Sequence, residues 1–242
     1  MNIVITMAGA GSRFKQAGYN IPKFMIKTHG KTLFDWSISS LADFIAIPDN
    51  HFIFVARKSD QANNFIKTHA SSLGIMHYHI IELDQLTDGQ ATSALLALPH
   101  CNLDEPLIIY NIDTYVEPPY LNHLDIKGDG FIPCFSAPGD HWSFVKLDSH
   151  GKATCVREKK RISDNCTIGL YYFKNCKIYE KAYHAYYTDS SHIEKNEKYI
   201  APLYNYLIDQ GYNIRISTIP STKVHVLGTP NEIKLFESEY QP

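Results

Sequence analysis

The sequence predicts an α/β fold, in which a mainly parallel central sheet carries a smaller antiparallel sheet as an insert. Two observations lead to this prediction. In the first half of the chain, strand-sized apolar runs alternate with segments whose apolar residues recur at helical spacing. After about residue 125, short strand-like segments follow one another across tight turns, which is typical of antiparallel pairing. The length of 242 residues suits one domain, and we expect a single domain over 1–242.

The first half is expected to alternate strands and helices in a β-α-β manner. Phe34, Ile38, Leu41 and Ile45 fall on one face of a helix, and the later helices show the same spacing. The expected order is a strand at 3–6, a helix over 34–45, a strand at 51–56, a helix over 62–73, a strand at 77–82, a helix over 91–98, capped by Thr87 or Asp88, and a strand at 107–110.

The second half is expected to add strands and two further helices. Strands are predicted at 131–136, 143–147, 152–157 and 167–173, then a helix over 200–208, a strand at 214–219 and a helix over 231–238. Gly211 follows the first of these helices at the position where glycine commonly ends one.

The composition argues against several classes of partner. A net charge of −2 does not favour a nucleic acid held by bulk charge. No apolar run approaches the roughly 20 residues needed to span a bilayer, and the start lacks the regions of a secretory leader. The five cysteines are scattered and odd in number, which indicates reduced thiols in a cytoplasmic protein.

A glycine loop follows the first strand and is the strongest functional signal. Gly9 and Gly11 would let backbone N–H groups approach an anion, and Arg13 and Lys23 add two cations nearby. The P-loop pattern fails because Ser12-Arg13 follows Gly11, and the dinucleotide pattern lacks its third glycine. We interpret the loop as a polyphosphate cradle, although the glycines alone also fit an ordinary tight turn.

Two further segments are expected on the same rim of the sheet. Asp113 follows the fourth strand, and ligands of open parallel sheets bind at the carboxyl ends of the strands. A carboxylate beside a triphosphate is a natural Mg²⁺ ligand, although a turn or helix-capping aspartate is the alternative. Gly89 and Gln90 open a helix there, where Gly89 would admit a flat ring and Gln90 or the backbone could bind its edge; simple capping explains the segment equally well.

A basic run at 157–161 lies just after a predicted strand of the added sheet. Charge runs of this kind are usually solvated turns. The functional interpretation is that Lys159 holds the phosphate of a second substrate, in a pocket lined by the 167–173 strand.

Taken in order, these segments resemble the sugar-phosphate nucleotidylyltransferase, or pyrophosphorylase, family. The resemblance covers essentially the whole chain, and it implies a Rossmann-like nucleotidyltransferase core that joins an NTP to a phosphate monoester with release of pyrophosphate. The motifs that carry it are Ala-Gly-Ala-Gly-Ser-Arg at 8–13, Pro22-Lys23, Asp88-Gly89-Gln90-Ala91, Asp113, Glu158-Lys159, Gly169-Leu170-Tyr171 and Gly228-Thr229-Pro230.

The resemblance also implies a role for each matched residue. Residues 1–125 would form the NTP-binding half, and residues 126–242 the acceptor-binding half. Arg13, Lys23 and Asp113 would be catalytic, with Asp113 also holding Mg²⁺. The nucleotide would contact Ala8, Gly9, Gly11, Ser12, Gly89 and Gln90, and the acceptor would contact Glu158, Lys159 and Gly169.

The chain also departs from the family pattern. Val226 stands where many members carry the aspartate that is the second metal ligand, and a valine cannot bind Mg²⁺. One carboxylate with phosphates and water could suffice, or His225 or a residue of 189–198 could substitute. Lys160 replaces the usual proline after Glu-Lys, and the segment 141–144 is unlike that of sugar-handling relatives.

These departures leave the acceptor open between a sugar 1-phosphate and a non-sugar phosphate, and they favour CTP as donor. The expected role is to supply activated precursors of surface polysaccharide. Two alternatives are a glycosyltransferase of similar architecture, although Asn111-Ile112-Asp113 is one acid short of its metal motif, and a nucleotide-binding protein without catalysis. The sequence leaves a homo-oligomer open.

Overall fold

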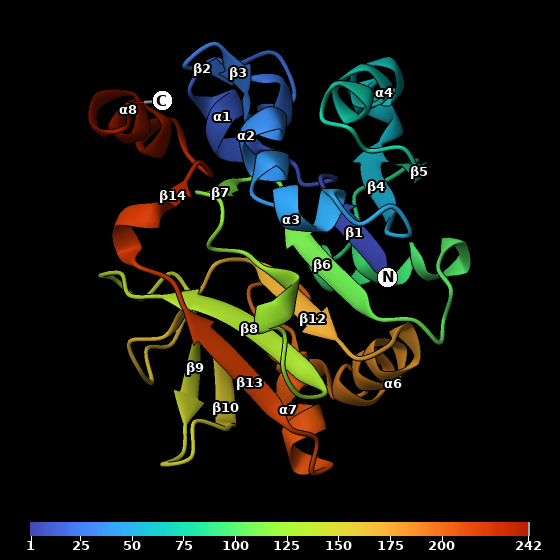
Figure 1. The fold of residues 1–242 in the computed structure, drawn as a ribbon, viewed down its shortest axis with the longest axis vertical. Coiled ribbons are helices and arrows are strands. Elements are labelled where there is room, and N and C mark those ends of the chain that lie inside the picture. The colour runs from blue at the N-terminus through green and yellow to red at the C-terminus, as the bar shows by residue number, and fades with distance from the viewer. Residues whose placement is uncertain (242) are drawn as a thin grey trace.

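The structure is a computed structural model that describes residues 1–241; residue 242, the last of the expected acceptor-binding half, lies outside the described range. One mixed sheet runs through the molecule, with helices packed along it (Figure 1). Its strands are β1 Asn2–Thr6, β4 His51–Arg57, β5 Tyr78–Leu83, β6 Leu107–Asn111, β8 Gly130–Phe135, β9 Ser143–Leu147, β10 Ala153–Glu158, β11 Cys166–Thr167, β12 Leu170–Phe173 and β13 Ile214–Thr218.

The strand order confirms the expected α/β fold. Strands β6, β1, β4 and β5 are neighbours in that order, and each pair is parallel. Strand β12 then pairs antiparallel with β6, so the antiparallel strands continue the central sheet. Two small sheets lie apart from it, formed by β2 Lys27–Thr28 with β3 Lys31–Thr32 and by β7 Thr114–Val116 with β14 Val224–Val226.

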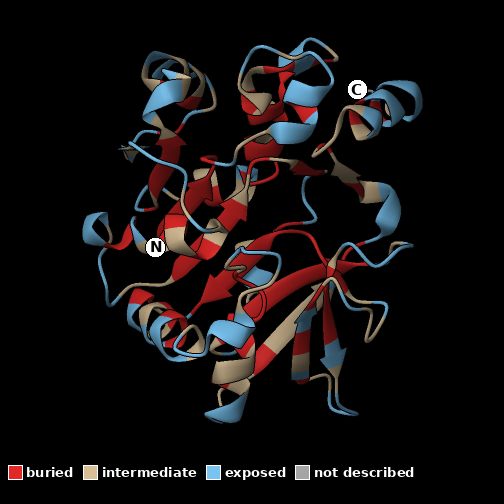
Figure 2. Ribbon diagram, turned by 180° about the vertical axis from the view of Figure 1, so that it is seen from behind, coloured by how far each residue is buried: buried red, intermediate tan, exposed pale blue. Residues whose placement is uncertain are grey.

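The helices cover both faces of the parallel strands, which explains why the inner strands β1, β4 and β6 are apolar on both sides. Ile5 of β1 packs in one hydrophobic cluster, and the adjacent Val4 packs in another. Figure 2 shows this burial in the central strands, with the exposed residues on the outer helices and loops. The helices are α1 Ser12–Gln16, α2 Leu33–Ser39, α3 Ala42–Ile45, α4 Asn63–Ser72, α5 Gln90–Leu95, α6 Cys176–Tyr186, α7 Leu203–Asp209 and α8 Pro230–Glu239.

Two of the expected elements are divided in the structure. The helix predicted over 34–45 is interrupted at Ser40 and Leu41, where the Ser40 hydroxyl accepts a hydrogen bond from the Val116 backbone. The strand predicted over 167–173 is interrupted at Gly169, whose φ of +87° is a left-handed conformation that no strand continues through.

Two other predictions about helices were wrong or incomplete. The predicted cap of α5 by Thr87 or Asp88 was wrong, since Gly89 is the capping residue. The Thr87 hydroxyl bonds the Gly89 carbonyl and the Ser93 hydroxyl, and the Asp88 carboxylate pairs with Lys198. Helix α6 was not predicted, although Asn175 caps it and its buried residues are spaced as on one helical face. Within residues 1–241, every helix is too short or too polar to cross a membrane.

Candidate active site

The functional residues expected from the sequence gather where β1 and β6 end. These strands are adjacent and parallel, with Thr6 in register with Asn111. The glycine loop that follows β1 and the turn that carries Asp113 therefore leave the sheet at the same edge (Figure 1). This is the edge at which open parallel sheets bind ligands.

The glycine loop turns sharply into helix α1. Gly11 has a φ of +63°, a left-handed conformation that a side chain would strain. Gly9 has an ordinary φ, and a Cβ built on it would meet no atom within 4 Å. The space beside Gly9 is thus open, as the predicted close approach of a ligand requires.

One cavity of about 360 Å³ collects all the residues predicted to bind the nucleotide. Arg13, Lys23 and Asp113 line it as well, so the structure brings the predicted catalytic residues together with the loop. The predicted nucleotide residues on its walls are Ala8, Gly9, Gly11, Ser12, Gly89 and Gln90.

Lys23 and Asp113, which both line this cavity, form an ion pair. The Lys23 ammonium donates to Oδ2 of Asp113 at 2.5 Å, and both side chains are largely shielded from solvent. The two residues come from opposite ends of the nucleotide half, so their contact depends on the sheet topology.

Gly89 is held by a contact that the sequence did not indicate. A Cβ at Gly89 would overlap the backbone of Lys198, which exchanges hydrogen bonds with Asp88 and Ala91. The Lys198 ammonium also lies 2.8 Å from Asp88. Burial would raise the pKa of Asp88, but hydrogen bonds from Lys198 and Thr92 outweigh it and lower that pKa. Gly89 therefore joins α5 to the chain at 198 as well as lining the cavity.

Gln90 lies at the junction between the nucleotide cavity and its neighbour. Its amide nitrogen donates to the Thr6 hydroxyl at 2.8 Å, and Gln90 lines both cavities. This bond fixes the amide group against β1.

A second cavity, of about 460 Å³, collects the predicted acceptor residues Glu158, Lys159 and Gly169. Arg13 and Asp113 line this cavity too, so the two cavities meet at the residues predicted to be catalytic. Its remaining walls are rich in aromatic and acidic side chains, including Phe135, Trp142, Tyr171, Tyr199, Glu197 and Glu232.

Glu158 ends β10 and is buried in this second cavity. Burial raises the pKa of its carboxyl, and the hydrogen bond from Ser143 and the nearby Lys159 oppose the shift only in part. Ser143 lies in register with Glu158 on the neighbouring β9, which explains the contact.

Lys159 adopts a conformation that is uncommon for a residue with a side chain. Its φ is +51°, in the left-handed region, where strain of this kind often marks functional sites. The turn aims its ammonium at the Tyr199 hydroxyl and over the Tyr199 ring, 4.0 Å from the centroid. Oε1 of Glu158 lies 3.5 Å from the same nitrogen.

Gly169 lies against Asn111, a residue that the sequence analysis did not assign to the site. A Cβ at Gly169 would overlap the Asn111 amide, so the glycine makes room for that side chain. Oδ1 of Asn111 is buried without a hydrogen-bond partner in the described residues, and Asn111 lines both cavities. The Asn-Ile-Asp sequence at the end of β6 is the signal that could have identified it.

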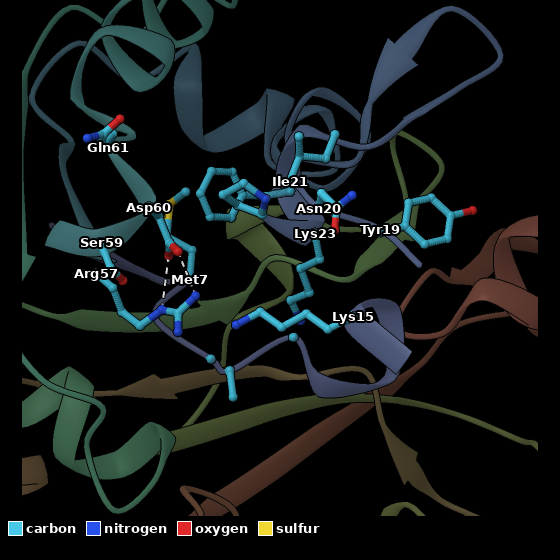
Figure 3. A pocket seen from close by; sticks show the side chains of 15 residues that line it. Met7, Lys15, Tyr19, Asn20, Ile21, Lys23, Arg57, Ser59, Asp60 and Gln61 are labelled. Atoms are coloured by element: carbon cyan, nitrogen blue, oxygen red, sulfur yellow. Dashed lines mark hydrogen bonds and ion pairs between the residues drawn. The ribbon is translucent and has the colours of Figure 1, made fainter. Parts of the chain in front are cut away.

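A third cavity, of about 580 Å³, lies on the other side of the glycine loop (Figure 3). Lys15 and Lys23 reach into it from the loop side, opposite the ion pair between Arg57 and Asp60. The sequence analysis did not single out Lys15, because a lysine on a short exposed helix gives no distinctive pattern. The glycine loop is thus a wall shared by two cavities.

The carboxylates at the site would supply only part of the ligand shell of Mg²⁺. Within residues 1–241, no group of three or more His, Cys, Asp or Glu side chains is arranged to hold a metal ion. Mg²⁺ typically takes one or two carboxylates and completes its shell with phosphate oxygens and water. Asp113, beside an open glycine loop, fits that requirement.

Comparisons with known proteins agree with this geometry. No protein-family model matches the chain, and no curated protein sequence matches it. A solved structure of a nucleoside-diphosphate-sugar pyrophosphorylase from Vibrio cholerae RC9 is 37% identical, with a TM-score of 0.90, over 98% of this chain and 100% of that one.

Two more distant structures share the fold. An inositol-1-phosphate CTP transferase from T. maritima has a TM-score of 0.77 at 15% identity, over 98% of this chain and 93% of that one. A CTP:phosphocholine cytidylyltransferase from Streptococcus pneumoniae has a TM-score of 0.74 at 14% identity, over 98% and 97%. On the identity to the first structure over nearly its whole length, the chain belongs to the sugar-phosphate nucleotidylyltransferase family.

Proposed function

We propose that this enzyme transfers a nucleoside monophosphate from an NTP to a phosphate monoester, with release of pyrophosphate. The observation that carries the proposal is the meeting of two cavities at Arg13 and Asp113, on the carboxyl edge of the parallel strands. One cavity holds the glycine loop, and the other holds Lys159. A donor and an acceptor can therefore be bound side by side.

The two halves of the chain divide these tasks in the proposal. Residues 1–125 would bind the NTP, since the nucleotide cavity is lined from this half except for Glu197 and Gly228. Residues 126–242 would bind the acceptor through Glu158, Lys159 and Gly169. Ala8, Gly9, Gly11, Ser12, Gly89 and Gln90 are the proposed nucleotide contacts.

The proposed chemistry is a direct displacement at the α-phosphorus. An oxygen of the acceptor phosphate forms the new bond to phosphorus, and the bond to the bridging oxygen of pyrophosphate breaks. A phosphate monoester is already anionic near neutral pH, because its second pKa is about 6. The acceptor therefore needs no general base.

The barrier is then repulsion between two anions, which the cations at the site would reduce. Arg13 and Lys23 would face the triphosphate, and Lys159 the acceptor phosphate. Positioning and preorganised charge are the usual sources of rate in phosphoryl-type transfers. When bound by Asp113 and phosphate oxygens, Mg²⁺ would neutralise part of the triphosphate charge.

The identities of the donor and the acceptor are also proposals, because family membership does not fix them. CTP is the favoured donor on sequence grounds, and the acceptor is a phosphorylated sugar or another phosphorylated small molecule. A role in supplying surface-polysaccharide precursors, a cytoplasmic location and a homo-oligomeric state stay predictions.

The test is pyrophosphate release from CTP, UTP, dTTP, GTP and ATP, each with a panel of sugar, choline and amino-acid phosphates. We expect release with one donor and acceptor pair, and loss of release in excess EDTA. Asp113→Asn should lower kcat by about 10²–10³, the scale for losing one preorganised charge at a reacting group. Asp125→Asn, at an exposed position, is the matched control.

Release of a nucleoside diphosphate from a nucleotide-sugar, with no pyrophosphate from any NTP, would instead indicate a glycosyltransferase. Activity that survives EDTA would remove Asp113 from its metal-binding role while leaving the transfer reaction in place.

A further inference from the structure

The metal site of the proposed function lacks one acid, because Val226 stands where the family pattern has its second aspartate. The structure nevertheless places Val226 at the site. Val226 ends β14, pairs across from Thr114 at the start of β7, and lines the acceptor cavity. The backbone is therefore in place at the site, but its side chain offers no oxygen.

A different carboxylate lies at the same place. Glu232 is in the first turn of α8, three positions after the capping residue Thr229. A methyl group built on Gly228 would lie 3.3 Å from Oδ2 of Asp113 and 3.5 Å from Oε2 of Glu232. Both carboxylates thus border one small space, which opens into the acceptor cavity.

The orientation of Glu232 is unusual for its position in the helix. A residue three positions after a threonine cap often folds its carboxylate back onto the cap, forming a capping box. Thr32 and Asp35 form that reciprocal pair at the start of α2. At α8 only one half is made, in which the Glu232 backbone N–H donates to the Thr229 hydroxyl at 3.2 Å.

Oε2 of Glu232 is instead buried without a hydrogen-bond partner in the described residues. A buried anionic oxygen with no donor is costly, and a second carboxylate nearby adds repulsion. Asp113 is compensated by Lys23 at 2.5 Å, whereas this oxygen of Glu232 is not. A bound cation would satisfy both carboxylates at once.

Neither other substitute suggested by the sequence fits as well. His225 points to Glu117, 3.1 Å away, and its ring stacks on Tyr115. Glu197 lines the cavities but is exposed, so its carboxylate is solvated.

We propose that Glu232 supplies the second carboxylate for a divalent cation at Asp113, in place of the acid that Val226 lacks. The inference rests on the proposed function, since it completes the metal site of that reaction. It assigns to this chain a metal ligand on the first turn of α8, whereas the family pattern places one on the preceding strand.

The test is direct binding of Mn²⁺ alone, measured from the electron paramagnetic resonance signal of the free ion. We expect Glu232→Gln to weaken Mn²⁺ binding about tenfold, because affinity at oxygen sites follows the number of charged ligands. Glu237→Gln, at an exposed position on the same helix, is the matched control and should bind as the wild type does. Equal affinity in all three proteins would overturn the inference.

A second variant protects the test against a folding defect. Glu232→Gln keeps the backbone N–H that Thr229 caps, and circular dichroism checks its fold. Adding Val226→Asp to Glu232→Gln should restore Mn²⁺ affinity to within about threefold of wild type, since it returns one carboxylate to the site. A double variant as weak as Glu232→Gln would show that the loss did not arise from a missing ligand.

The Mn²⁺-binding test of Glu232 and the pyrophosphate-release test of the proposed function can fail separately. Failure of the wild type to bind Mn²⁺ would overturn the assignment of Glu232, whereas pyrophosphate release by the same protein would still support the transfer reaction.

Discussion

The ammonium of Lys23 lies 2.5 Å from the carboxylate of Asp113, although ninety positions separate the two residues. Both residues line the nucleotide cavity, and Asp113 lines the acceptor cavity as well. Without ligands, the residue proposed to hold the triphosphate thus neutralises the residue proposed to hold the metal. Binding of NTP with its cation would exchange this pair for two pairs with the substrate.

Replacing Lys23 by alanine should lower kcat by about 10²–10³, because one preorganised cation facing the triphosphate is lost. Arg13→Ala should have an effect of the same size. Lys27→Ala, at an exposed position in β2, is the control and should retain wild-type kcat. Steady-state pyrophosphate release measures all three, and full activity in Lys23→Ala would end its proposed role.

Gly169→Ala should disturb the site through Asn111. The added methyl group would overlap the Asn111 amide, and the φ of +87° is strained for alanine. We expect a loss of about 2 kcal/mol in the free energy of unfolding, as for other overpacked buried positions, together with reduced activity. Chemical denaturation and pyrophosphate release are the measurements.

A double variant identifies the cause of that loss. Asn111→Ala added to Gly169→Ala removes the overlapping group, so it should recover part of the stability without recovering activity. If the two substitutions lowered the free energy of unfolding by strictly additive amounts, Gly169 would not be making room for Asn111.

The parts of the site that could be predicted are those that follow from strand order. Gly9 and Asp113 each come directly after an apolar run, and adjacent parallel strands bring their carboxyl ends together. Lys23 was also predicted at this site, because its motif is local. The sequence could not show that Lys23 and Asp113 bind each other, since this depends on side-chain directions.

Glu232 and Gly89 show why the remainder was not predicted. Thr229 followed three positions later by Glu232 matches a capping box, and only the buried Oε2 reveals that the carboxylate turns to Asp113. The segment at Gly89 was interpreted through a ligand or through helix capping, whereas the lack of a side chain at Gly89 also admits Lys198. In both cases the partner is distant in sequence, and no spacing rule encodes it.

Lys159 allows strain and function to be separated. Its φ of +51° is unfavourable for any residue with a Cβ, so Lys159→Gly should be more stable than Lys159→Ala by about 1 kcal/mol. Both variants lose the ammonium and should lose acceptor binding equally, seen as a raised KM for the acceptor. Denaturant unfolding compares the stabilities, and an alanine variant as stable as the glycine variant would contradict the strain.

The buried carboxyl of Glu158 should make stability depend on pH. Burial raises its pKa in the folded protein above the ordinary value of 4.5. Between 4.5 and that raised value, the folded state keeps a proton that the unfolded state has lost, so the wild type loses stability as the pH rises through this window.

Glu158→Gln has no such titration and can still accept the Ser143 hydrogen bond. The melting temperature of Glu158→Gln should therefore increase relative to that of the wild type between about pH 4 and about pH 8, while Glu237→Gln, at an exposed position, should show no such trend. Thermal unfolding across this range is the measurement, and a difference that stayed constant or shrank with rising pH would show that Glu158 ionises normally.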